Sequence, residues 1–204
     1  MEAIETKTIG KYRIDIIPDE EPQSPREWDN LGTMVCFHNR YSLGDDHSYS
    51  HQDYSGWEEM KKAIIRNENA GVILPLYLYD HSGITMNTTG FSCRWDSGQV
   101  GWIFISKEKM REEYSKKRIS KQLIERVAGY LKGEVETYDQ YLTGDVYGFR
   151  ITDTETDEEA DSCWGYYGTD NCMEEAEGIV KYLMGDEGDE EDENIRRKTN
   201  LVDL

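Results

Sequence analysis

Alternation of apolar and polar residues predicts β-strands along much of the chain. In GKYRIDII, residues 10–17, Tyr12, Ile14 and Ile16 alternate with charged side chains, the period-two pattern of a half-buried strand. The apolar run at residues 72–80 is short enough for a buried strand, although its Pro75 favours a sheet edge or a bulge. Similar patterns predict further strands at residues 33–38, 84–88, 99–106, 145–152 and 161–168.

Apolar residues at helical spacing predict helices between these strands. Trp57 and Ile64 fall on one face of a helix that Ser55 can cap and that ends near residue 69. Gly129 and Gly133 are expected to weaken or bend the longest of the other helices. These other helices are predicted at residues 107–114, 120–142 and 171–184.

The order of these elements is mixed rather than strictly alternating, which is typical of the α+β class. We therefore expect an antiparallel sheet, formed by a meander and a C-terminal hairpin, packed by three or four helices. At 204 residues the chain is long enough to bury a real core, and no internal repeat divides it. The sequence predicts a single domain over residues 1–184 and an acidic C-terminal tail over residues 185–204.

The net charge of −19 is unevenly distributed along the chain. Residues 1–150 carry 24 acidic and 19 basic side chains, whereas residues 151–204 carry 18 and 4. A negative field of this kind repels phosphate backbones and anionic lipid, so no direct contact with nucleic acid or a membrane is expected. The basic stretch KKRISK, residues 116–121, is interpreted as a solvated helix start. The partner predicted from charge is a basic protein.

The cysteine pattern and the N-terminus predict a cytoplasmic protein. Four cysteines are scattered without CxxC spacing, and the first residues lack the charged and apolar blocks of a signal peptide. We expect reduced thiols in a soluble protein, because no apolar run approaches the roughly 20 residues that a membrane span needs.

The histidines suggest a metal site as an alternative function. Three of the four lie in the stretch WDNLGTMVCFHNRYSLGDDHSYSH, residues 28–51. A divalent metal could be held there and at the next strand turn by His38, His47, His51, Asp80, His81 and Asp96. The spacing matches no HExxH frame, so loop histidines that are hydrogen-bonded to carboxylates and backbone are the favoured interpretation.

Two further constellations could carry chemistry. Cys36 and His38 would share a face of a strand as nucleophile and base, but Cys36 sits in an apolar run where a buried packing residue is the usual reading. Carboxylates of Asp29, Asp80 and Asp96 could converge in a pocket, although such residues in turns most often bond their own backbone. Phosphate-binding loops and GxSxG are absent from the sequence, which favours a binding protein over an enzyme.

Several long strings resemble a family of uncharacterised proteins encoded by bacteriophages, prophages and related mobile elements. They span residues 10–168 and are SPREWDNLGTMVCFHNRYSLGD, PLYLYDHSG, WDSGQVGWIFISKEK, ETYDQYLTGDVYG and SCWGYYG. The resemblance implies a small accessory phage protein in the cytoplasm of a bacterial host, a class in which inhibitors of host defence are frequent. It supplies no catalytic residue.

Charge and resemblance together predict an inhibitor without a cofactor. Its acidic surface would bind a basic, nucleic-acid-handling bacterial protein of the kind that anti-restriction and anti-CRISPR proteins block. Two alternatives stay open: a metal-dependent hydrolase or ligand-binding domain that uses the histidines, and an oligomeric interaction protein. The contact residues predicted for the acidic surface are Asp153, Glu155, Asp157, Glu158, Glu159, Asp161, Glu174, Glu175 and Glu177.

Overall fold

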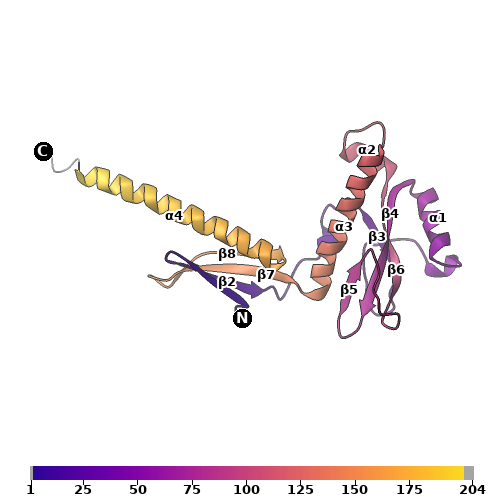
Figure 1. Cartoon of the computed structure of the whole chain (residues 1–204), viewed down its shortest axis with the longest axis horizontal. Coiled ribbons are helices and arrows are strands. Elements are labelled where there is room, and N and C mark those ends of the chain that lie inside the picture. Colours follow the sequence, from indigo (N-terminus) through magenta and orange to yellow (C-terminus); the bar gives the residue numbers. More distant parts are fainter. Residues whose placement is uncertain (1, 200–204) are drawn as a thin grey trace. The chain divides into compact units, whose positions relative to one another are not determined.

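The computed structural model describes the backbone of residues 2–199 and the side chains of residues 2–185. Over this range it contains four α-helices and two antiparallel four-stranded sheets, which confirms the α+β prediction (Figure 1). The residues predicted as one domain form two compact units, the central unit Gln23–Thr143 and the terminal unit Met1–Pro22 with Gly144–Leu204. They divide in this way because each sheet has its own hydrophobic core.

The central unit is a sheet with helices on both faces (Figure 1). Its strand order is β3-β6-β4-β5, which differs from the predicted meander because β6 pairs with β4 instead of with β5. Helix α3 covers one face and α1 the other. The elements are β3 (Thr33–Cys36), α1 (Trp57–Asn67), β4 (Ala70–Asp80), β5 (Ile84–Asn87), β6 (Ser97–Ser106), α2 (Lys107–Glu113) and α3 (Lys121–Thr143).

The helices of the central unit pack on its sheet through apolar side chains that recur at helical spacing. On α3 the buried residues Val127, Leu131, Val135 and Tyr138 recur at helical spacing and pack on the sheet. The helix is continuous through Gly129 and Gly133, the two residues that were expected to weaken or bend it. Helix α1 begins after Gly56 without a side-chain cap. The predicted cap, Ser55, instead donates a hydrogen bond of 2.7 Å from its backbone N–H to the carboxylate of Glu59.

The terminal unit joins the two ends of the chain in one sheet. Its strand order is β1-β2-β7-β8, and the predicted C-terminal hairpin is present as β7 and β8. Ile14, Ile16, Phe149 and Ile151 point from the sheet towards Ala176 and its apolar neighbours on α4. The elements are β1 (Glu5–Ile9), β2 (Tyr12–Pro18), β7 (Val146–Asp153), β8 (Glu158–Tyr167) and α4 (Thr169–Thr199).

The predicted acidic tail begins inside a helix. The backbone of α4 continues to Thr199, whereas the predicted helix ends at residue 184. Residues 200–204 of the predicted tail lie outside the described residues, as do the side chains from residue 186 onward. None of the helices in the described range combines the length and the apolar character needed to cross a membrane.

Candidate functional site

The turn of the β7–β8 hairpin is built by a carboxylate. Asp153 accepts hydrogen bonds from the backbone N–H groups of Glu155 at 2.9 Å and Thr156 at 3.4 Å, and Lys11 lies 3.0 Å from its other oxygen. These backbone bonds, together with Lys11, hold the pKa of Asp153 below its ordinary value. Asp157 completes the turn with φ of +59°, a left-handed conformation that aspartate tolerates better than most residues. Asp153 is therefore a structural residue of the turn.

The predicted acidic loop at residues 153–161 is mostly strand. Its turn comprises only residues 154–157, and Glu158, Glu159 and Asp161 belong to β8. Strand β8 lies at a sheet edge, and its first eight residues are exposed. The edge has β-bulges and Asp161 accepts the backbone N–H of its neighbour Ser162 at 2.7 Å, both of which discourage addition of another strand.

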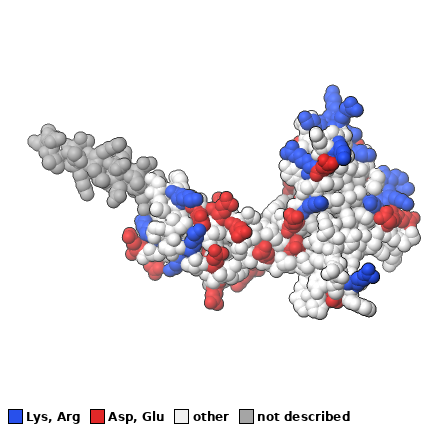
Figure 2. Space-filling model, in the orientation of Figure 1, with Lys and Arg blue, Asp and Glu red and all other residues white. Residues whose placement is uncertain are grey.

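The carboxylates of the hairpin fall into paired and unpaired groups. Glu159 lies 3.0 Å from Arg150, and Asp153 is paired as described above. Within the described part of the chain, Glu155, Asp157, Glu158 and Asp161 have no cation within ion-pair distance. Figure 2 shows acidic side chains over this unit interspersed with a few basic ones. On the hairpin, the carboxylates of Glu155, Asp157 and Glu158 are thus the most available to an external cation, because Asp161 already accepts the N–H of Ser162.

The acidic residues predicted on the last helix behave similarly. Glu177 lies 2.6 Å from Lys7 of strand β1, and the hydrogen bond from Lys7 lowers the pKa of its carboxyl group. Glu174 and Glu175 are exposed on α4. Helix α4 therefore contributes two exposed carboxylates, Glu174 and Glu175, to the acidic surface, whereas the carboxylate of Glu177 binds Lys7 of β1.

The depressed pKa of Asp153 predicts a pH dependence of the hairpin. A carboxyl whose pKa is lower in the folded state contributes stability above its ordinary value of 3.8, and this contribution is lost as the pH falls through the folded-state pKa. Asp153→Asn keeps an acceptor for the turn but removes the titration. Urea unfolding between about pH 7 and pH 3 should therefore show a smaller acid-induced loss in the variant. Equal losses in both proteins would contradict this role of Asp153.

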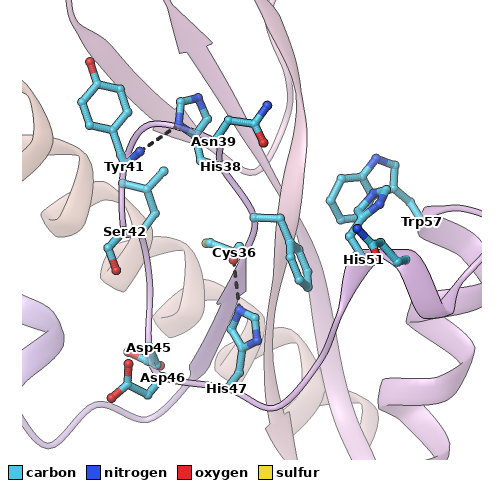
Figure 3. A pocket seen from close by; sticks show the side chains of 13 residues that line it. Cys36, His38, Asn39, Tyr41, Ser42, Asp45, Asp46, His47, His51 and Trp57 are labelled. Atoms are coloured by element: carbon cyan, nitrogen blue, oxygen red, sulfur yellow. Dashed lines mark hydrogen bonds between the residues drawn. The ribbon is translucent and has the colours of Figure 1, made fainter.

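The histidine-rich stretch lines a cavity of about 670 Å³ in the central unit. Figure 3 shows His38 and Tyr41 at one end of it, Asp45, Asp46 and His47 at the other, and His51 with Trp57 to one side. The ring centroids of His51 and Trp57 are 5.0 Å apart. His47 bonds the carbonyl oxygen of Cys36 through Nε2 at 3.0 Å, so its buried Nδ1 carries a lone pair without a partner.

The six predicted metal ligands are distributed over separate contacts. The Nδ1 of His38 accepts the backbone N–H groups of Arg40 and Tyr41 at 3.2 Å, while its Nε2 lies 3.3 Å from Asp80. Asp80 also accepts a hydrogen bond from Arg40, which lowers the pKa of its carboxyl. His81 lies 3.6 Å from Asp96, and His47 and His51 line the cavity. Among the described side chains, no three His, Cys, Asp or Glu residues form a group that could hold a metal ion.

The other two constellations do not form as reactive sites in the described structure. Strand β3 ends at Cys36, so His38 lies in the following loop instead of on a shared strand face. Burial raises the pKa of the Cys36 thiol to about 12, which keeps it protonated near neutral pH. Asp29 is exposed and Asp80 and Asp96 meet through a backbone hydrogen bond of 2.8 Å, which fits turn chemistry.

A buried ion-pair network beside the cavity could not be predicted from spacing. The guanidinium of Arg26 is 5% exposed and donates two hydrogen bonds to Asp45, at 2.8 and 2.6 Å, and one to Glu134 at 3.2 Å. Burial alone would lower the pKa of Arg26. The hydrogen bonds and charges of Asp45 and Glu134 outweigh this effect, so the pKa lies above its ordinary value. Asp45 also accepts the N–H of Met34, and Glu134 that of Leu31. The network fixes both flanks of β3 to α3.

Comparison with models of known protein families, with curated proteins and with solved structures finds no match to this chain.

Proposed function

We propose that this chain is a non-enzymatic binding protein that blocks a basic, nucleic-acid-handling bacterial protein through its β7–β8 hairpin. The carboxylates of Glu155, Asp157 and Glu158 would stand where phosphates of the nucleic acid normally lie. The observation that carries the proposal is that these three carboxylates are exposed and unpaired at the end of a hairpin whose other acids hold an ion pair or accept a backbone hydrogen bond.

The surroundings of the hairpin support a protein partner. Trp164 follows the acidic residues on β8, is 40% exposed, and offers an aromatic anchor of the kind that dominates binding interfaces. The terminal unit carries 25 acidic and only 8 basic side chains, so its field attracts positively charged surfaces to this unit. A bacterial host and a phage-type role in countering host defence are the context that the sequence resemblance implies.

The triple variant Glu155→Lys, Asp157→Lys, Glu158→Lys tests this proposal. Tagged protein is incubated with nuclease-treated bacterial lysate at low and high ionic strength, the captured proteins are identified, and their oligonucleotide binding is measured with and without the chain. Wild-type protein should inhibit a basic captured protein, and the variant should bind it at least about tenfold more weakly, since each reversed charge turns an attraction into a repulsion. The difference should shrink at high salt.

The control is Glu2→Lys, Glu20→Lys, Glu21→Lys, which makes the same change in charge on exposed residues of the same unit. It should retain most of the inhibition. Equal loss in both variants would mean that net charge, and not the hairpin, drives binding, and unchanged inhibition by the hairpin variant would reject the proposal.

A further inference from the structure

The two units differ sharply in charge. The central unit carries 15 basic and 17 acidic side chains, close to balance, whereas the terminal unit holds the remaining 8 and 25. The net charge of −19 argues against contact with nucleic acid, but nearly all of this excess negative charge belongs to the terminal unit. Repulsion between exposed charges fades over roughly a Debye length of 10 Å at 0.1 M salt, so the local charges of a surface, more than the net charge of the chain, decide what it binds.

The turn between α2 and α3 forms such a surface. Lys116, Lys117, Arg118 and Lys121 are all exposed, and the nearest acidic residues in sequence are Glu113 and Glu125. Lys121 lies 3.7 Å from Glu125, but no carboxylate of the described residues lies within ion-pair distance of the other three cations. Figure 2 shows basic side chains gathered at the end of the unit where Figure 1 places the α2–α3 turn.

Two aromatic rings lie near this turn: Tyr114 directly follows α2, and Tyr130 of α3 has its ring centre 6.4 Å from that of Tyr114. The guanidinium of Arg126 lies 5.5 Å from the ring centre of Tyr114 and 5.6 Å from that of Tyr130, and it donates a hydrogen bond of 3.2 Å to the hydroxyl of Tyr130. Tyr130 is 48% exposed and Ile124 is 39% exposed. Tyr114, two residues before Lys116, thus links the cationic turn to the exposed ring of Tyr130, which Arg126 also contacts.

We propose that this basic turn surface, formed by Lys116, Lys117, Arg118, Lys121, Arg126 and Tyr130, binds single-stranded nucleic acid. The cations contact successive phosphates, and an unpaired base stacks on the exposed part of Tyr130. A duplex has its base faces covered, and an acidic peptide has no base to stack, so the exposed ring favours a single strand over both. The inference concerns a different unit from the proposed hairpin function and does not depend on it.

The direct test is fluorescence anisotropy of a labelled oligothymidine of about 15 nucleotides with the full-length chain, over roughly 25 to 200 mM NaCl. About four phosphate contacts predict that the logarithm of the association constant falls with the logarithm of salt with a slope of roughly −3. A duplex of the same length should bind several-fold more weakly. Absence of binding at the lowest salt, or a duplex that binds as tightly, overturns the proposal.

Two variants separate charge from stacking. Lys117→Glu with Arg118→Glu should weaken binding at least about tenfold and flatten the salt slope, whereas Tyr130→Ala should weaken it several-fold at an unchanged slope. Lys62→Glu with Arg66→Glu is the matched control, because it reverses one exposed lysine and one exposed arginine on α1. Equal effects of the two charge reversals overturn the site. If Tyr130→Ala changes nothing and polyglutamate competes as well as the oligonucleotide, the surface binds acidic protein and the proposal fails.

Discussion

Replacing Arg26 with methionine is expected to lower the free energy of unfolding of the central unit by about 3 kcal/mol. The methionine fills much of the space of the arginine stem but leaves Asp45 and Glu134 without their cation. This value is the lower end of the range for a broken buried ion pair, because Asp45 and Glu134 keep side-chain exposures of 22% and 16%. Urea unfolding followed by circular dichroism at pH 7 measures the loss.

Two comparisons distinguish the network from an ordinary surface contact. Arg13 bonds Asp15 at 3.0 Å with 42% of its side chain exposed, so Arg13→Met should cost less than about 1 kcal/mol. Adding Asp45→Asn and Glu134→Gln to Arg26→Met should recover part of the loss, since the amides are uncharged yet still accept the backbone N–H groups. A loss as small for Arg26 as for Arg13 would show that the network does not stabilise the loops around β3.

Local patterns predicted most elements, and the exceptions have physical reasons. Strand β1, ETKTI, lacks the apolar alternation that marks a strand in sequence, and four of its five residues are exposed. It forms because β2 offers a free edge to pair with. Pro75 lies within β4, opposite Trp102 of β6, at a position where the other side of the strand is unpaired because pairing with β5 begins at Tyr77, so a proline is tolerated there as on an edge strand.

The candidate sites were predictable only as residue types. The hairpin carboxylates were predicted together, but whether each one is free depends on neighbours far away in sequence, such as Lys11 for Asp153 and Lys7 for Glu177. Arg26 and Glu134 are 108 residues apart, and no spacing rule connects them. A charged residue directly after a proline, in a loop rich in backbone turns, was the one signal that could have pointed to Arg26.

The division into two units also changes how the chain's composition is understood. Averaged over 204 residues, the charge suggests a uniformly acidic protein that avoids nucleic acid. Divided by unit, the same residues give an acidic hairpin on one sheet and a basic turn on a nearly neutral second unit. Sequence order concealed this division, because the terminal unit is assembled from both ends of the chain.

Phe149→Ala should destabilise the terminal unit by about 3–5 kcal/mol. Phe149 is fully buried, and it packs with Ile14, Ile16 and the apolar face of α4 in a core that the central unit does not share. Truncation removes a large buried ring and leaves a cavity between sheet and helix. Hydrogen exchange followed by mass spectrometry should then show lost amide protection in β2 and β7, while β4 and β6 keep theirs.

The reciprocal variant is Leu131→Ala, which removes a fully buried side chain from the α3 face of the central core. Its expected cost is about 2–5 kcal/mol, and protection should fall in β4 and β6 while β2 and β7 are unaffected. The two variants thus test whether each sheet depends on its own core. If either one lowered protection equally in all four strands, the cores would unfold as one cooperative unit, and the division into an acidic unit and a nearly neutral one would lose its physical basis.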